Sequence, residues 1–350
     1  MNRTLLRGAL VILPILVSLV VTALFILLVG GDPLLVVQTT LEGAFRDSRS
    51  FAGVVNYWIP LALCSMGLII TFTAGLWNIG VEGQMVLGAI AASFIARTLG
   101  ESLPTEVLIP IEMVAAMIGG GLWAALVGVL KVKLGVHEIF GGVALNSLAN
   151  VYAIYLIAGP WAPPEGGNAQ STAPFPPASL YPRLSAEFPI SLIMLILALV
   201  AIVVVVLALR GTRWGLQLKA TGKNAKSALL LGVPTAQSAL TAFIVCGVLA
   251  GIAGSYRALL TYGSLRPLVS GGIGFLALLV VLLASTRALW TPFIAFIFAV
   301  LWVGVTRLRV VLQLDQSLAG VLQGFVVLLV LLSSGLRQRL EVKEQSAHEH

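Results

Sequence analysis

The amino-acid sequence predicts an all-α, polytopic integral membrane protein with about ten transmembrane helices. Hydrophobic residues make up 59% of the 350 positions and charged residues only 10%, whereas an average soluble domain has roughly 25% charged residues. The apolar residues fall into runs of about 20, the length that a helix needs to cross the hydrocarbon core. The formal charge of +7 gathers in short segments between these runs. This is the pattern of cytoplasmic loops and does not indicate a nucleic-acid partner.

The expected spans follow one another within a single transmembrane domain, residues 1–350, with both termini in the cytoplasm. The apolar run that follows Arg3 and Arg7 is longer than a signal-peptide core, so we interpret it as a retained first helix. Cys64 and Cys246 lie within apolar runs, where they predict neither a disulfide framework nor a metal site. The spans are expected near residues 8–30, 54–74, 84–96, 107–130, 138–158, 190–209, 238–262, 272–286, 290–309 and 318–335.

Longer polar segments separate some of these spans. Residues 31–56 mix acidic and basic side chains with short apolar stretches, so this segment is expected outside the membrane. Residues 159–189 are rich in proline and nearly free of charge, which predicts an external loop. Residues 210–237 carry arginine and lysine but no acidic residue, so they are expected in the cytoplasm. The polar tail, residues 337–350, is expected there too.

Residues 75–89, which read GLWNIGVEGQMVLGA, interrupt the apolar pattern with Asn78, Glu82 and Gln84. A charged side chain at the bilayer centre costs about 2.5–3.5 kcal/mol, so it usually faces a protein interior or a wet path. Non-helical backbone at membrane depth is tolerated only where it is buried in protein or lines a cavity. We therefore predict a discontinuous helix beside a translocation path lined by these three side chains. The glycines that allow the break are Gly75, Gly80, Gly83 and Gly88.

The expected fifth span adds two amides to the candidate path. Asn146 and Asn150 are four residues apart, which places both side chains on one face of a helix. The same spacing also suits hydrogen bonds between helices, worth about 0.6 kcal/mol each on membrane averages. Both interpretations remain open at this stage.

The basic cytoplasmic segment contains a short helix with clear end signals. Asn224 can cap a helix over Ala225–Leu231, Gly232 can end it, and Pro234 follows. A short capped helix held between two membrane spans can transmit a rigid displacement, whereas a flexible loop would absorb it. The alternative is that the segment only anchors the chain to anionic lipid.

The chain has no motif that would make it an enzyme on its own. Residues 220–224 resemble part of a phosphate-binding loop, but they lack its first glycine, and Asn224 stands where Ser or Thr is needed. The three histidines lack the spacing of a zinc site. We therefore expect no catalytic residue, no metal site and no nucleotide hydrolysis by this chain alone.

With these features in place, residues 75–89 closely resemble the signature of ABC-importer permeases of the branched-chain amino acid, ribose and nucleoside superfamily. The form is most similar to the nucleoside and simple-sugar branch. The resemblance covers nearly the whole chain, because further segments match that branch in the same order. They are residues 32–34 with 43–45, 136–139 through 145–146, 213–215 through 220–224, and 271–275.

The resemblance implies a permease subunit of a prokaryotic plasma (inner) membrane transporter that moves a nucleoside or a simple sugar inward. It implies no cofactor in this chain, because ATP and Mg would be bound by separate ABC ATPase subunits. It also implies a second, often paralogous, permease subunit and an extracytoplasmic substrate-binding protein. The short cytoplasmic helix would sit in a groove of the ATPase. The residues expected to couple the two are Gly222, Lys223, Asn224, Ala225, Ala228 and Gly232.

Other functions fit parts of the same pattern. The solute could be a branched-chain amino acid or another small molecule carried by an ABC permease. An ion-coupled secondary transporter would have a similar composition, but this chain alone would then carry out uptake. A lipid-modifying membrane enzyme would need Glu82 and His137 in one pocket, and the expected spans separate them. For Glu82 itself, the alternative to a path residue is a buried acid that accepts hydrogen bonds from backbone amides freed by the glycine break.

Overall fold

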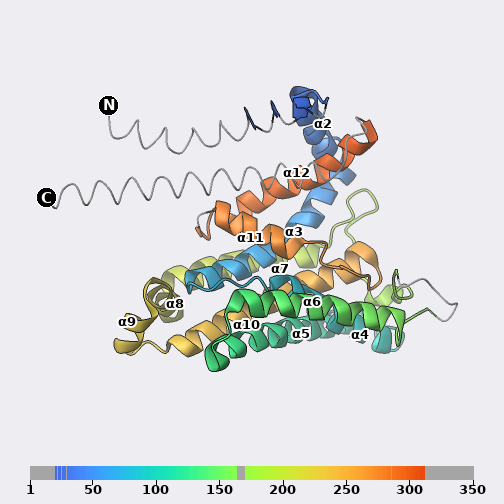
Figure 1. Ribbon diagram of the computed structural model, residues 1–350. Helices are drawn as coiled ribbons and strands as arrows, with labels where there is room; N and C mark the ends of the chain where they lie inside the picture. The colour runs from blue at the N-terminus through green and yellow to red at the C-terminus, as the bar shows by residue number, and fades with distance from the viewer. Residues whose placement is uncertain are drawn as a thin grey trace, which may run out of the picture. The chain divides into compact units, whose positions relative to one another are not determined.

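The computed structural model describes residues 20–311 except 22, 25, 29, 164–169 and 285 (Figure 1). Throughout this described part the regular structure is helical, which confirms the predicted all-α class. Five of the helices are long and apolar enough to cross a membrane. They are α3 (Ser48–Thr73), α5 (Thr105–Leu134), α6 (Glu138–Ala158), α7 (Leu192–Gly211) and the continuous helix Thr235–Tyr262, made of α10 (Thr235–Tyr256) and a π-helical turn, η2 (Arg257–Tyr262).

The remaining expected spans correspond to shorter helices or lie outside the described residues. The third span is α4 (Val81–Leu99), the eighth is α11 (Ile273–Leu283) and the ninth is α12 (Thr291–Val311). The expected span at 8–30 lies mostly, and the one at 318–335 wholly, outside the described part of the chain. The protein is thus a polytopic membrane protein, as the sequence predicts.

The described residues divide into two compact units, one formed by the two ends of the chain and the other by Val55–Phe296. In the first unit, α2 (Pro33–Phe45) packs closely against α12, because a Cβ atom at Gly304 would lie 2.2 Å from the carbonyl oxygen of Thr40. Asp32 starts α2 by accepting a hydrogen bond from the backbone N–H of Leu34 at 2.9 Å. Residues 31–56, expected as a mixed polar connection, are therefore largely helical.

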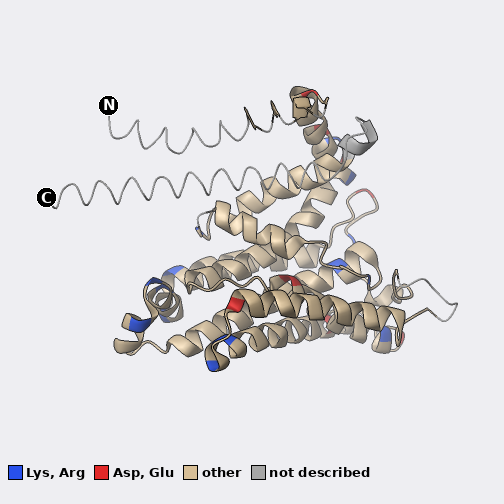
Figure 2. Ribbon diagram, in the orientation of Figure 1, with Lys and Arg blue, Asp and Glu red and all other residues tan. Residues whose placement is uncertain are grey.

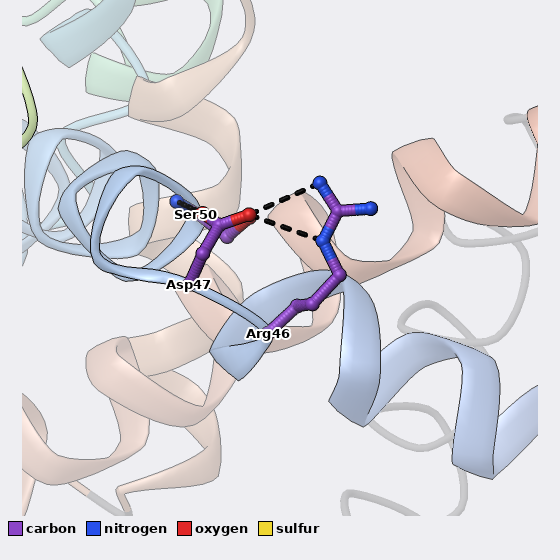
Figure 3. A network of polar contacts seen from close by, with 3 residues as sticks. All are labelled: Arg46, Asp47 and Ser50. Atoms are coloured by element: carbon purple, nitrogen blue, oxygen red, sulfur yellow. Dashed lines mark hydrogen bonds and ion pairs between the residues drawn. The ribbon is translucent and has the colours of Figure 1, made fainter.

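Asp47 starts the next helix, α3, in the same way (Figure 3). Its Oδ1 accepts from the backbone N–H of Ser50 at 2.7 Å, and its Oδ2 forms an ion pair with Arg46 at 3.0 Å. The hydrogen bonds from Ser50, together with those from Arg46, lower the pKa of the Asp47 carboxyl to about 2. These contacts fix where α3 begins.

The core of the second unit is built from α4, α5 and α10, which meet through small residues. A Cβ atom at Gly88 of α4 would lie 2.3 Å from the Cα of Gly251 in α10. A Cβ atom at Gly120 of α5 would lie 2.2 Å from the carbonyl oxygen of Gly247. The glycines let the three backbones approach directly, which is the usual way for membrane helices to pack.

The segment expected as an external loop, of which residues 159–163 and 170–189 are described, folds back onto the end of α10. It contains a short 3₁₀ helix, η1 (Pro177–Ser179). Phe175 donates its backbone N–H to the carbonyl of Gly263 at 2.9 Å, and Thr172 donates to the carbonyl of Leu265 at 3.0 Å. The loop is therefore fixed to the residues that follow η2.

Candidate translocation and coupling sites

The discontinuous helix is present where the sequence predicts it. α3 ends at Thr73 and Gly75 takes the left-handed conformation, with φ +73°. The N–H of Leu76 bonds back to the carbonyl of Thr71 at 2.9 Å, and that of Gly75 to Phe72 at 3.0 Å. This pair of bonds is a Schellman motif, which closes a helix and turns the chain away. The chain re-enters a helix only at Val81, so residues 74–80 form the break.

Inside the break, two of the predicted path residues bind each other. The side-chain amides of Asn78 and Gln84 exchange two hydrogen bonds, of 3.1 and 3.0 Å. Asn78 also donates to the sulfur of Cys246 in α10 at 3.1 Å. Both amides are completely buried. The pair therefore joins the two ends of the break and attaches them to α10.

Asn146 of α6 supports the same break from the other side. Its Oδ1 accepts from the backbone N–H of Gly83 at 2.7 Å, and its Nδ2 donates to the carbonyl of Ile79 at 2.9 Å. Asn146 thus satisfies two of the backbone groups that the break leaves without helical partners. One turn later, Asn150 donates to the carbonyl of Asn146, but its buried Oδ1 has no hydrogen-bond partner among the described residues.

Glu82 connects the break to α11. Its carboxylate accepts from the hydroxyl of Ser270 at 2.5 Å and from the backbone N–H groups of Gly272 at 3.0 Å and Gly274 at 2.7 Å. These amides belong to the N-terminus of α11, where the helix dipole favours a negative charge. A buried acid bonded to backbone amides was the structural alternative in the sequence, although the amides come from α11 and not from the break itself.

Two buried charged residues were missed by the sequence analysis. Arg257 in η2 donates to the hydroxyl of Tyr262 and, at 3.4 Å, to the carbonyl of Val269, and its guanidinium lies 4.6 Å from the Tyr262 ring centre. Glu112 in α5 is wholly buried and lies away from the break, near Ser179 of η1. A lone charge inside an apolar span was the signal that could have identified both.

The basic segment, residues 210–237, contains two short helices, α8 (Arg213–Lys223) and α9 (Ala225–Leu230). Basic residues occur along both helices (Figure 2). Asn224 caps α9 as predicted, accepting from the N–H of Ser227 at 3.0 Å. Ala228 is only 3% exposed and faces the permease itself. The exposed apolar cluster at the end of α9 is instead formed by Leu229, Leu230 and Leu231, which are 61%, 89% and 85% exposed.

Some of the other predicted coupling residues are exposed, and others have structural positions within the segment. Lys223, Asn224 and Ala225 are exposed around the junction of α8 and α9. Gly232 has φ +81° and ends α9. Gly222 lies against the end of α3, since a Cβ atom there would be 2.2 Å from the carbonyl oxygen of Thr73. The segment therefore has an exposed apolar tip on α9 and a backbone contact with α3 at Gly222.

Sequence comparisons identify the family of the chain. Residues 50–331 match the family described as branched-chain amino acid transport system / permease component. A glucose ABC transporter permease protein of Haloferax volcanii is 28% identical over 92% of this chain and 86% of its own length. A guanosine ABC transporter permease protein of Bacillus subtilis is 23% identical over 93% of both chains.

A nucleoside ABC transporter permease protein of Lactococcus lactis is 23% identical over 81% of this chain and 79% of its own length. A second nucleoside permease protein of the same organism also matches. The family match covers most of the chain, including the break, α8, α9 and α11. The chain is a transport subunit and not an enzyme: it belongs to the branched-chain amino acid transport system permease family of ABC transporters.

Proposed function

We propose that this permease imports a nucleoside or a simple sugar, driven by separate ATPase subunits that bind ATP and Mg. The matched relatives are permeases for glucose, guanosine and nucleosides, which supports this solute class. The observation that carries the coupling to an ATPase is the apolar tip of α9. Exposed leucines are unremarkable in lipid, but a cluster of three in a basic cytoplasmic segment is suited to burial in a partner protein.

In the proposed docking, Leu229, Leu230 and Leu231 enter a groove of the ATPase. The exposed junction residues Lys223, Asn224 and Ala225 surround the groove, and basic side chains favour an acidic rim. Gly222, Ala228 and Gly232 would hold the shape of the segment without contacting the partner. This refines the expectation from the sequence, in which Ala228 was to meet the ATPase directly.

The solute is proposed to pass along a surface formed by the break, residues 74–80, and the polar side chains around it. Asn78, Glu82, Gln84 and Asn146 shape this surface through their hydrogen bonds to one another and to freed backbone groups. Asn150 offers the one acceptor of this set that has no partner among the described residues. Opening of this surface would then expose amide groups that suit the hydroxyl-rich surface of a sugar or nucleoside.

The assembly is proposed to contain a second, paralogous permease subunit and an extracytoplasmic substrate-binding protein. Paired permease names among the relatives support the former. The proposed site is a prokaryotic plasma membrane, with both termini and α8–α9 in the cytoplasm, as the basic residues of that segment favour.

The docking is tested by replacing Leu230 with Asp and measuring copurification of the cognate ATPase in detergent. Leu184→Asp is the matched control, because Leu184 is 55% exposed in the loop expected on the opposite side. We expect Leu230→Asp to lose the ATPase and Leu184→Asp to keep it. Retention by both variants would refute the docking.

Transport is tested in proteoliposomes that contain the assembled complex and its binding protein. We expect uptake of a radiolabelled nucleoside or sugar only when the ATPase is supplied with ATP, with no effect of ionophores. Ionophore-sensitive uptake by this chain alone would identify an ion-coupled transporter instead.

A further inference from the structure

The C-terminus of α3 and α8 approach each other directly, backbone to backbone, at Gly222. A Cβ atom built on Gly222 would lie 2.2 Å from the carbonyl oxygen of Thr73 and 3.0 Å from the nitrogen of Gly75. A Cβ atom built on Gly75 would lie 3.1 Å from the Cα of Gly222. A contact of 2.2 Å with backbone cannot be relieved by turning a side chain, so α8 fits against α3 only because residue 222 is glycine. Gly75 is favoured for a different reason, its left-handed φ of +73°.

This contact lies at one end of a rigid connection to the proposed ATPase site. Asn224 is both the C-cap of α8 and the N-cap of α9, and it is the single residue between the two helices. Its backbone N–H bonds to Ala220 at 3.2 Å, and its side chain accepts from Ser227 at 3.0 Å. A push on α9 therefore moves α8 and Gly222 with it.

On the α3 side of the contact, Gly75 is itself part of the break. Residues 76–83 follow Gly75, and they are bound to three further helices. Asn146 holds Gly83 and Ile79 to α6, Asn78 reaches Cys246 in α10, and Glu82 holds the start of α11. A displacement of Gly75 is thus passed to α6, α10 and α11.

We propose that the contact between Gly75 and Gly222 is the point where motion of the cytoplasmic segment enters the discontinuous helix. The inference rests on the proposed function, because it assumes that an ATPase moves α9. Gly222 acts as a positioning residue: it touches neither ATPase nor solute. Because the contact has no yielding side chain, it transmits a displacement with little loss. Packed elements of this kind switch between discrete arrangements.

The test compares Gly222→Ala with Gly211→Ala in the assembled transporter. Both replace a glycine near a helix end, and intrinsic helix propensity favours alanine at both. A Cβ atom at Gly211 has nothing within 4 Å, so that variant is the matched control. We expect Gly222→Ala to keep the ATPase and its ATP hydrolysis while uptake per ATP falls about tenfold, within the range seen for mutations in coupling networks. Normal uptake per ATP in Gly222→Ala would overturn the inference.

A second measurement uses the unaltered contact, so it remains decisive if Gly222→Ala fails to fold. Spin labels at the exposed positions Trp77 and Lys219 report the distance between the break and α8. We expect the same distance in the nucleotide-free and vanadate-trapped states, while each label moves relative to a third label on α5. Separation of the first two labels would overturn the inference. Loss of ATPase binding by Leu230→Asp would still stand, so the proposed function and this contact fail independently.

Discussion

The carboxylate of Glu82 accepts a hydrogen bond of 2.5 Å from the hydroxyl of Ser270, a residue 188 positions further along the chain. The same carboxylate accepts from the backbone amides that open α11. One acid therefore closes the N-terminus of α11 while standing in the first turn of α4. The two helix starts are held together at a position where neither could bond to water.

This arrangement predicts that Glu82→Gln destabilises the protein. A carboxamide places an N–H donor where one carboxylate oxygen now accepts, so at least one of the three donors loses its partner. We expect a loss of about 1.5–3 kcal/mol, the usual value for hydrogen bonds to a charged group. Thermal unfolding in detergent measures the change. Glu101→Gln, at an exposed site, is the control and should unfold like the parent. Equal melting of all three proteins would show that Glu82 does not hold α11.

The amide pair of Asn78 and Gln84 is expected to behave as one unit. Leucine at either position alone leaves a buried amide without its partner, whereas leucine at both removes the unmet polar groups. The double variant should therefore be more stable than the sum of the single losses predicts, with a coupling free energy on the order of 1 kcal/mol. A double-mutant cycle of unfolding measures this. Strict additivity would indicate that the two amides are energetically independent.

Arg257→Lys is expected to loosen the residues that follow η2. Lysine lacks the planar group that bonds Val269 while lying over the Tyr262 ring. Hydrogen exchange of residues 263–272 should become faster, with less effect on α5. Arg266→Lys is the comparison, since Arg266 is exposed although it lies 5.2 Å from the same ring centre. If both substitutions have the same effect, burial of Arg257 is not what orders the segment.

Asp47 is expected to stabilise the start of α3 only above strongly acidic pH. Its pKa is lowered in the folded protein to about 2, and an unfolded chain has an aspartate pKa of roughly 3.9. The contribution is therefore complete above about pH 4 and is lost as the pH falls toward about 2. An NMR titration of the Asp47 carboxyl measures the folded value. Ser50→Pro removes the N–H donor and should move that pKa upward, and an unchanged titration would exclude the cap as its cause.

Much of the helix pattern could be predicted from the sequence, because span length and local end signals are encoded within a few residues. Asn224 and Gly232 marked the ends of α9 correctly. The cap at Asp32, followed by Pro33, is an equally local signal for α2. The mixed charges of residues 31–56 outweighed it, so the helix was missed.

The side-chain partners of the candidate site could not be predicted in the same way. Asn78 and Gln84 are six residues apart across a turn, a spacing that matches no helical face. The partner of Glu82 lies in another helix, and only the folded chain shows that its acceptors meet Ser270 and α11. The sequence identified the polar residues that are unusual within a membrane span. The hydrogen-bond partner of each side chain depends on tertiary packing.

The shared cap at Asn224 limits which sequence changes the segment of α8 and α9 can tolerate. One extra residue between α8 and α9 would rotate the leucines by about 100°, because a helix turns once per 3.6 residues. This segment should accordingly tolerate exchanges at its exposed positions, but almost no insertion or deletion.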